Sequence, residues 1–513
     1  METTKKAVKE RPTVLCKLCK KPVVHGVLPD FCNECAPAIL RRYADKAEER
    51  DPLPENLTDL GNMERLVVRH GDDFRYTKAR GWLFWDNGRW TVDELGKINQ
   101  AAYDTARKIR AEVRLTKKED EDAEEVKKAI VKWSKTSEAK ARLDAMVSLA
   151  ESDSKIACRL EDFDANLSLF NCSNGTIDLI TGTLRPATRG DLLTNISPAA
   201  YDPEAQCPRW IRFILEIMSG DQQMADFLQR AVGYSLTGET SEQCMFILWG
   251  TGANGKTTFV ETLRYVLGTY AQAADFQTFM AKRFGPQSGP SSDIAKLRGA
   301  RFVSATEGEE GQKLAESVIK QITGGDTITA CFKFKEHFEF SPQLHLWLCT
   351  NHKPQVVGTD EGIWRRIRLI DFNERFAKDD TLGACLKSEA AGILRWAMEG
   401  MNQWRQFGLM EPQRVLNTTT EYRADEDIIC RFVNDECEVA KGEETPSRRL
   451  YDAYKAWARD NHEIEMSERK FADTMKDHGY VKRKKPAGIF YSGLKRINQF
   501  QEQTMAIGEF EAM

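Results

Sequence analysis

No stretch of this 513-residue chain is a long apolar run. A membrane-spanning helix needs roughly 18 or more consecutive apolar residues, and nothing here approaches that length. The N-terminal sequence METTKKAVKERP also lacks the apolar core of a secretory signal. These absences predict a soluble chain, which has room for about three domains at roughly 100–200 residues each.

An excess of charge of one sign is also missing. The chain carries 74 Lys and Arg against 78 Asp and Glu, a formal net charge of −4. This balance argues against indiscriminate binding to polyanions. Any contact with nucleic acid must therefore use local basic patches.

Cysteines are few and scattered, except near the start of the chain. Four of the thirteen form two pairs there, and the others are isolated in apolar or helical surroundings. Isolated cysteines of this kind are typical of reduced thiols in a cytosol-like compartment.

The two cysteine pairs have the spacing of a zinc site. Cys16-x-x-Cys19 and Cys32-x-x-Cys35 are separated by twelve residues, slightly fewer than is usual for this pattern. Four thiolates form a closed tetrahedral zinc site, and the metal would supply the folding energy of so small a segment. A disulfide pair and a chance pattern are the alternatives. The segment could contact DNA or another protein.

The strongest motif lies in the middle of the chain, in the stretch FILWGTGANGKTT. An apolar run at 245–249 predicts a buried strand, and FVETLRYVL predicts a helix after the loop. Between them stands the phosphate-binding pattern of a glycine, four residues and Gly-Lys-Thr. Lys256 is expected to reach the β- and γ-phosphates, and the Thr257 hydroxyl to hold Mg²⁺. A chance glycine turn is the alternative. The predicted nucleotide-binding residues are Gly250, Thr251, Gly252, Ala253, Asn254, Gly255, Lys256, Thr257 and Thr258.

Acidic residues follow the next apolar run, ARFVSA at 300–305. A carboxylate at the end of a strand beside a phosphate loop can hold Mg²⁺ and orient the attacking water. We expect Glu307 and Glu309 to act here, with Glu310 in reserve. An exposed acidic turn is the alternative.

Two further segments offer polar groups to the same site. A third buried strand is expected at 344–348 and leads to Asn351, which could sense the γ-phosphate or position water. The segment WRRIR at 364–368 contains three arginines, one of which could complete a neighbouring subunit's site as an arginine finger. A structural or surface arginine is the alternative for each.

Two segments combine basic and aromatic residues. The alternating sequence at 327–340 predicts a hairpin that carries Lys333, Lys335 and His337 between phenylalanines. It is either a finger on nucleic acid or a strand with a solvated basic face. The aromatic hairpin around Asn87-Gly88 could stack on bases, although core packing is the favoured reading.

The C-terminal sequence predicts a basic module. Residues 448–497 indicate a helix, a second helix and a basic hairpin, an order typical of a winged helix. Residues 467–496 hold nine Lys or Arg against three acids, a local charge of +6. DNA binding is favoured over a simple capping role. The expected contacts are Lys482, Arg483, Lys484 and Lys485.

From about residue 61 to 372 the chain resembles the phage and plasmid replication primase-helicases, a family that includes the poxvirus primase-helicase and belongs to helicase superfamily 3. The matching motifs occur in order over some three hundred residues. They are NGTIDLITG at 174–182, Tyr201-Asp202, Cys207-Pro208-x-Trp210, GTGANGKTT, Glu307-x-Glu309-Glu310-Gly311, IKQITGGDTITA at 319–330, TNHKP at 350–354 and GTDEGIWRRIRLIDF at 358–372.

The resemblance implies an α/β fold with an AAA+-like P-loop ATPase core, assembled as a hexameric ring that moves along single-stranded DNA. It assigns Lys256, Glu307 and Glu309 to ATP hydrolysis with Mg²⁺, Asn351 to the sensor, and Arg366 (or Arg365) to the finger that acts in trans. Lys333 and Lys335 fall in the segment that forms the DNA-gripping hairpin. The expected layout is a zinc ribbon at 1–40, a linker at 41–60, an α+β helicase-associated domain at 61–215, the ATPase at 216–420, a winged-helix-like domain at 421–500 and a tail at 501–513.

One departure from the family is informative. Family members often carry an N-terminal primase or polymerase domain, but here fewer than sixty residues precede the helicase-associated region. We therefore expect a separate primase or polymerase as partner, acting in the cytoplasm of a bacterial host. The leading hypothesis is an ATP-dependent DNA helicase acting on single-stranded or forked DNA. The alternative is an initiator that binds origin duplex DNA and uses ATP only to assemble. A small-molecule P-loop kinase is disfavoured, since it has no use for the zinc pairs or the basic C-terminal module.

Overall fold

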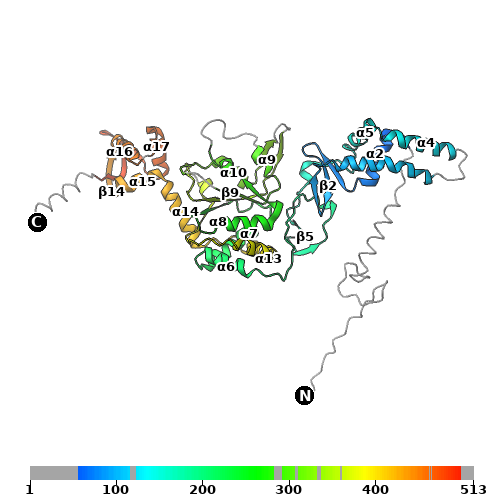
Figure 1. Ribbon diagram of the computed structural model, residues 1–513. Helices are drawn as coiled ribbons and strands as arrows, with labels where there is room; N and C mark the ends of the chain where they lie inside the picture. The colour runs from blue at the N-terminus through cyan, green and yellow to red at the C-terminus, as the bar shows by residue number, and fades with distance from the viewer. Residues whose placement is uncertain are drawn as a thin grey trace, which may run out of the picture. The chain divides into compact units, whose positions relative to one another are not determined.

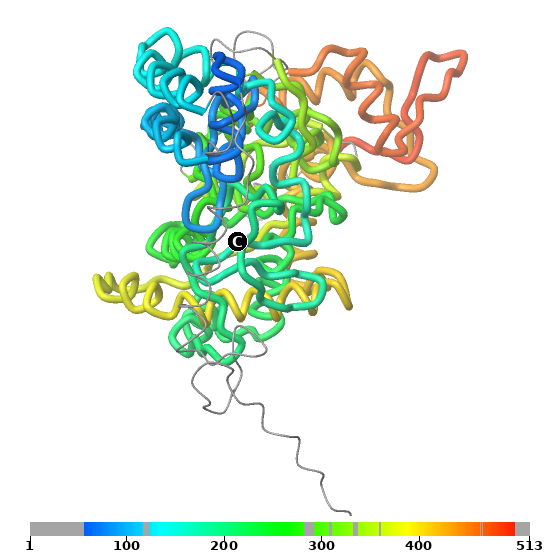
Figure 2. Tube along the Cα trace, turned by 90° about the vertical axis from the view of Figure 1, so that its right-hand side faces the viewer, coloured from blue at the N-terminus to red at the C-terminus, as the bar shows by residue number. Residues whose placement is uncertain are grey.

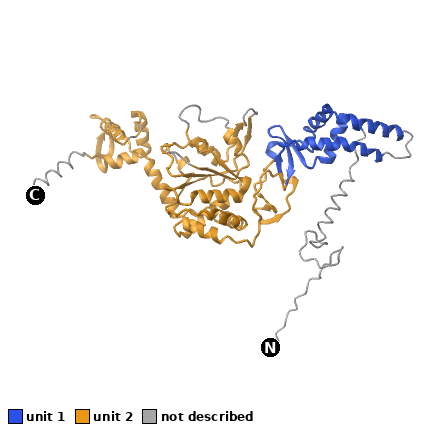
Figure 3. Ribbon diagram, viewed as in Figure 1, with its two compact units in different colours: residues 1–86, 90–162 blue, residues 87–89, 163–513 orange. Residues whose placement is uncertain are grey.

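The computed structural model describes residues 56–115, 123–281, 292–306, 310–331, 337–358, 361–461, 463 and 465–497. These form two compact units, one ending at Asp162 and the other beginning at Phe163 and including Asn87–Arg89 (Figure 3). The domain boundary expected at 215 instead falls inside α6 (Pro208–Ile217). The expected zinc ribbon at 1–40, most of the linker and the tail at 501–513 lie outside the described residues.

The first unit combines a small antiparallel sheet with helices. Asn87 and Gly88 have φ of 47° and 91°, the left-handed values that a two-residue hairpin turn requires, so the hairpin predicted from Asn-Gly is confirmed. Trp90 is 1% exposed and packs against Trp85. This supports the prediction that Trp90 packs in the core rather than stacking on bases. The elements are α2 (Asp59–His70), β1 (Phe74–Thr77), β2 (Gly81–Asp86), β3 (Arg89–Val92), α3 (Lys97–Lys108), a 3-10 helix (Ile109–Leu115), α4 (Ala123–Ser137), α5 (Lys140–Ala150) and a 3-10 helix (Leu160–Asp162).

A five-stranded parallel sheet forms the centre of the second unit. Its order is β13-β7-β12-β9-β8, and every pairing is parallel. Parallel strands covered on both faces read as continuous apolar runs, which is why the sequence revealed three of them at 245–249, 300–305 and 344–348. The strands are β7 (Met245–Trp249), β8 (Ala271–Ala274), β9 (Phe302–Thr306), β12 (His345–Thr350) and β13 (Ile367–Asp371).

Alternate residues of β7 enter two different cores. Phe246 and Leu248 pack with α6, α7, α8 and α13, whereas Met245 and Ile247 pack with residues of α9 and α10. Figure 1 shows these two groups of helices on opposite faces of the sheet. The helices are α7 (Gln222–Tyr234), α8 (Lys256–Leu267), α9 (Ser292–Lys296), α10 (Glu316–Gly324), α11 (Glu361–Trp364), α12 (Leu382–Ser388) and α13 (Ala390–Phe407), with 3-10 helices at Arg189–Asp191, Gly268–Tyr270 and Phe276–Phe279.

Two hairpin-like segments flank this sheet. The region around NGTIDL forms three strands, β4 (Leu169–Cys172), β5 (Gly175–Asp178) and β6 (Thr183–Arg185). The expected hairpin at 327–340 is present as β10 (Ile328–Cys331) paired antiparallel with β11 (His337–Phe340). Residues 332–336 between them lie outside the described residues.

The C-terminal part of this unit has its own apolar core. The elements follow the order helix, strand, helix, helix, strand, strand after the connecting α14, so the helix-helix-hairpin expected at 448–497 is confirmed. Figure 2 shows the β15–β16 hairpin, in red, extending from the helices. The elements are α14 (Gln413–Glu426), α15 (Ile428–Glu436), β14 (Cys437–Pro446), α16 (Ser447–Asp460), α17 (Glu468–Asp477), β15 (Lys482–Lys485) and β16 (Gly488–Arg496). The described ranges contain no helix of the length and apolarity that a membrane crossing requires.

Candidate nucleotide-binding site

The loop between β7 and α8 has the backbone geometry of a phosphate cradle. Gly252, Ala253 and Gly255 all have positive φ, of 94°, 51° and 88°. A Cβ on Gly255 would also lie 2.6 Å from the Ile217 side chain, so only glycine fits there. The loop ends at the N-terminus of α8, where free backbone N–H groups and the helix dipole attract anions.

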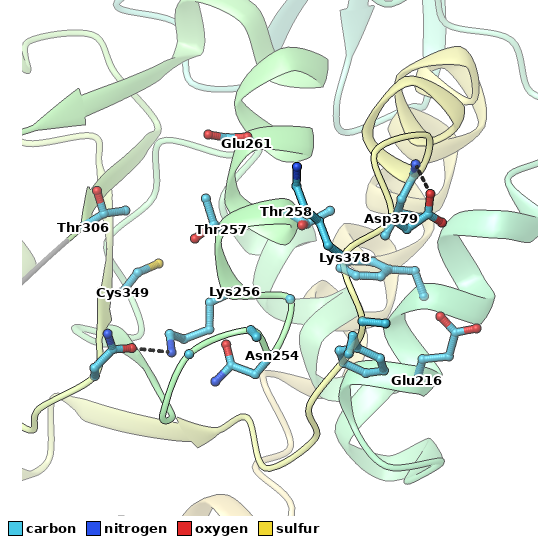
Figure 4. Close-up of a pocket in the computed structure, with 18 of the residues that line it drawn as sticks. Glu216, Asn254, Lys256, Thr257, Thr258, Glu261, Thr306, Cys349, Lys378 and Asp379 are labelled. Carbon is cyan, nitrogen blue, oxygen red and sulfur yellow. Dashed lines mark hydrogen bonds between the residues drawn. The ribbon is translucent and has the colours of Figure 1, made fainter.

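A cavity of about 930 Å³ opens beside this loop. It is lined by the ends of β9 and β12 together with the loop itself, which is the edge of a parallel sheet where ligands bind in α/β folds. Figure 4 shows Lys256, Thr257 and Thr258 on α8, Thr306 and Cys349 at the strand ends, and Glu216, Lys378 and Asp379 at the other end of the cavity. Gly252 to Thr258 all line it, whereas Gly250 and Thr251 are not among its lining residues in the described chain.

Lys256 is the central cation of the cavity. Its side chain is 6% exposed, and its ammonium donates to the Gly250 carbonyl and to Oδ1 of Asn351 at 3.1 Å. Burial lowers the pKa of Lys256 below its ordinary value. Because both present partners are uncharged oxygens, an incoming phosphate oxygen is the stronger acceptor and can replace them. The structure therefore brings together two predicted site residues that are 95 positions apart in the sequence.

Asn254 lines the cavity, as the motif predicted, and its side chain also holds the loop. It is 3% exposed, and its side-chain amide donates to the Phe372 carbonyl at 3.1 Å. This hydrogen bond ties the loop to the chain just after β13. Asn254 lines the cavity but holds the loop in shape, so its contribution is positioning.

The strand ends supply the wall opposite α8. Thr306 ends β9 and lines the cavity, and burial raises the pKa of Cys349, next to the end of β12, to about 12. The Cys349 thiol is therefore neutral at physiological pH. The expected acids Glu307 and Glu309 lie outside the described residues, and Glu310 is exposed. Their roles stay predictions.

The three arginines of the 364–368 segment have distinct surroundings. Arg366 is 7% exposed and donates to Thr323 Oγ1 at 3.0 Å and to the Gly362 carbonyl, which are bonds within its own chain. Arg368 pairs with Glu411. Arg365 is exposed, and among the described residues its guanidinium donates one hydrogen bond, to the Gln243 side chain at 3.2 Å. Arg365 is thus better placed than Arg366 to reach another subunit.

The residues expected to contact DNA are only partly described. Lys333 and Lys335 lie outside the described residues, as do the zinc candidates Cys16, Cys19, Cys32 and Cys35; His337 is exposed on β11. In β15, Lys485 pairs with Glu444 and Lys482 lies over the Tyr491 ring. Arg483 and Lys484 are exposed beside them.

Sequence reasoning missed the other end of the cavity. This end combines apolar rings with charged groups, and its members come from α6 and from the segment before and into α12. These residues do not form a recognisable sequence motif for phosphate binding. The motif around Trp210 did, however, mark the start of α6. The residues are Arg209, Phe213, Glu216, Phe376, Lys378, Asp379 and Leu382.

Three family models match the chain. Residues 63–219 match the model described as D5 N terminal like, and residues 424–505 match the one described as Poxvirus D5 protein-like. Residues 248–366, which include the phosphate loop, match a family of unknown function (DUF5906).

Individual relatives come from large DNA viruses. The chain is 29% identical over 299 residues to a protein of Acanthamoeba polyphaga mimivirus named "Putative helicase", covering 54% of this chain and 31% of that protein. It is 22% identical over 266 residues to a "Putative helicase" of Frog virus 3, with 47% and 27% covered. A "Putative primase" of African swine fever virus is 21% identical over 335 residues, with 59% and 34% covered. The chain thus spans about a third of the length of these relatives. Among solved structures, the apo NrS-1 C-terminal region aligns with 85% of this chain and 99% of its own, at 9% identity and a TM-score of 0.45.

Proposed function

The chain belongs to the D5-like primase-helicase family, and on this premise we propose that it is an ATP-driven DNA helicase of replication. The observation that carries the proposal is the contact between Lys256 and Asn351 in the cavity at the strand ends. This contact joins the phosphate loop to the end of β12. Loss of the γ-phosphate on hydrolysis would therefore change the hydrogen bonding of the residue that follows this strand.

The residues of the cavity divide the work of binding and hydrolysis. The loop N–H groups and the Lys256 ammonium would hold the phosphates, and the Thr257 hydroxyl would hold Mg²⁺, which neutralises charge on the phosphates. Asn351 exchanges its hydrogen bond from Lys256 for one to the γ-phosphate or the attacking water. Glu307 and Glu309 are proposed to orient that water.

The end of the cavity that the sequence did not reveal suits the nucleoside. Phe376 and Leu382 offer apolar surface to a base, and Arg209 and Glu216 form an ion pair at 3.1 Å beside it. Apolar walls with a few polar groups are typical of small-molecule sites. This arrangement supports a nucleotide rather than a bare phosphate as ligand.

We propose that the motor acts as a ring. Arg365 is exposed and, among the described residues, does not line its own chain's cavity, which supports a site completed by a neighbouring subunit. A head-to-tail interface of this kind closes into a ring, for which we propose a hexamer. Lys333, Lys335 and His337 are proposed to contact single-stranded DNA inside it.

Strand displacement tests the helicase directly. With ATP and Mg²⁺, the wild-type chain is expected to separate a forked DNA, and single-stranded DNA is expected to stimulate its ATPase. A non-hydrolysable ATP analogue should support DNA binding without strand separation. ATP hydrolysis at the same rate with and without DNA, together with no displacement, would contradict the motor.

The alternative function is an ATP-assembled initiator that binds origin duplex DNA. The helix-strand-helix-helix-strand-strand order of the C-terminal module and its exposed basic hairpin favour duplex binding by a winged helix. This module could equally load a helicase onto its template.

Charge reversal in the hairpin separates these roles. The double variant Arg483→Glu, Lys484→Glu is expected to weaken duplex binding and to lower the salt slope of log K by about 2, since about one counterion is released per phosphate contact. DNA-stimulated ATPase on single strands should persist. Lys441→Glu, an exposed lysine on β14 of the same module, is the matched control. Sequence-specific duplex binding without any strand separation by the wild type would favour the initiator.

A further inference from the structure

We propose that Asp427, Cys430 and His478 form a site for a transition-metal ion, of which Zn²⁺ is the best fit, in the C-terminal module. Asp427 precedes α15 and Cys430 lies in its first turn, whereas His478 follows α17, 48 positions later in the chain. One ligand atom from each residue lies within 4.8 Å of the other two. This site is distinct from the four cysteines near the N-terminus and from the nucleotide cavity.

His478 is oriented as a metal ligand. Its Nδ1 lies 2.8 Å from the Thr474 carbonyl, which can only accept a hydrogen bond, so Nδ1 carries a proton. Its Nε2 lies 2.6 Å from Oδ2 of Asp427, a carboxylate oxygen that also accepts. Nε2 must therefore carry a second proton, which makes the ring an imidazolium, or bind a cation. An Nδ1–H bond to a carbonyl is the support that orients ligating histidines.

The two carboxylate oxygens of Asp427 have different hydrogen-bond partners. Oδ1 caps α15 by accepting from the backbone N–H groups of Ile429 and Cys430, at 3.1 and 3.0 Å. Oδ2 makes neither of these capping bonds and faces His478. A monodentate carboxylate with its other oxygen held in place is pre-organised for a cation, because the capping bonds fix the plane of the group.

Cys430 determines the class of the ion. Its thiol is half-buried, and burial with the nearby Asp427 carboxylate raises its pKa to about 11. It is therefore protonated in the metal-free protein, and an ion must displace that proton. A sulfur, a nitrogen and an oxygen together suit Zn²⁺, whereas Mg²⁺ and Ca²⁺ prefer oxygen alone.

The spacing requires only a small adjustment. Bond lengths of about 2.0–2.3 Å around tetrahedral zinc place ligand atoms roughly 3.3–3.7 Å apart. Nε2 and Oδ2 would separate by about 1 Å from their present contact, which side-chain rotation can supply. Three protein ligands leave a fourth position for water.

The surroundings favour a cation. Asp427 and His478 line a cavity of about 220 Å³ together with Glu426 and Asp477. Arg423 is the basic residue among the described lining residues besides His478, and its guanidinium pairs with Glu361 at 2.9 Å. An ion here would join the start of α15 to the end of α17 and would stabilise the module that carries the basic hairpin.

Zinc content and stability of the full chain test this site. The chains are first treated with a chelator and then exposed to a slight excess of Zn²⁺. After free ion is removed, the zinc bound per chain is measured by elemental analysis. Cys430→Ser and His478→Gln are each expected to lower bound zinc by one equivalent per chain. Cys385→Ser, an exposed free cysteine on α12, should leave it unchanged. Any zinc that the N-terminal cysteines bind would be the same in all three variants, so it cancels in the comparison.

Two further readouts keep the test decisive. Asp427→Asn retains the helix cap, because asparagine caps as well as aspartate, yet should also lose metal affinity. Co²⁺ in place of Zn²⁺ should give a thiolate charge-transfer band that weakens in Cys430→Ser. Equal zinc content and an equal cobalt spectrum in wild type and Cys430→Ser would overturn the metal site and leave an imidazolium–carboxylate ion pair.

Discussion

Replacing Lys256 with alanine is expected to lower kcat for ATP hydrolysis about 10²–10³-fold, the usual cost of removing one pre-organised charge-stabilising donor. The ammonium is the buried cation that we propose to bind the phosphates, and its present partners are the Gly250 carbonyl and Asn351. Asn351 lines the open cavity, where water can replace the ammonium. The variant should therefore fold normally while losing hydrolysis and strand displacement together.

Lys296→Ala serves as the control for this experiment. Lys296 is an exposed lysine of α9 in the same unit and pairs with Asp293 at 3.1 Å. Its loss removes an equal charge without touching the cavity, so steady-state ATPase with single-stranded DNA should stay at the wild-type rate. Wild-type hydrolysis by Lys256→Ala would show that the cavity is not the catalytic site.

Arg365→Ala is expected to lower DNA-stimulated kcat about 10³-fold or more, within the range for arginine fingers. The physical reason is exposure: the Arg365 guanidinium makes one described hydrogen bond, to Gln243, and we propose that it reaches a neighbouring subunit's γ-phosphate. Thermal stability should be nearly unchanged, as for most surface substitutions. A wild-type kcat in Arg365→Ala would exclude it as the finger.

Arg366→Ala is the contrasting variant. Arg366 donates to Thr323 Oγ1 and to the Gly362 carbonyl inside its own chain. Removing it leaves buried acceptors unpaired, at a cost of about 1–3 kcal/mol in the free energy of unfolding. We therefore expect a lower unfolding temperature for Arg366→Ala, with any loss of kcat following the loss of folded protein.

Mixing two inactive variants tests the shared site. If each site takes its lysine from one subunit and its arginine from the next, then equal amounts of Lys256→Ala and Arg365→Ala chains regain about a quarter of the intact interfaces. Measurable ATPase in the mixture, absent from either variant alone, is the expected result. No recovery despite subunit exchange would place both residues in a site within one chain.

Several features were predictable because they are encoded over short distances. The phosphate loop needs glycines at fixed spacings between an apolar strand and a helix, and β7, the loop and α8 follow that pattern. The Asn87-Gly88 turn is equally local, since the positive φ of both residues selects those residue types. The order helix, helix, hairpin at 448–497 was predictable for the same reason, because each element is encoded by a local pattern.

Other features depend on contacts between distant segments. Nothing near Arg366 in the sequence reveals that its guanidinium donates to Thr323, 43 positions away, so the sequence could not separate it from Arg365. The division at Asp162 and Phe163 was not predicted, because compactness is a property of long-range contacts and all the quoted motifs lie on one side of it, at 174–372.

The sequence by itself determined the chemistry of the phosphate loop and the order of its flanking elements, because backbone conformation there follows from residue type and spacing. Tertiary structure alone decided which distant groups meet. It paired Lys256 with Asn351, closed the cavity with α6 and the segment around Phe376, and brought His478 to Asp427 and Cys430. These contacts depend on how the helices pack on the sheet and on each other. That packing is determined by the whole apolar core rather than by any local sequence pattern.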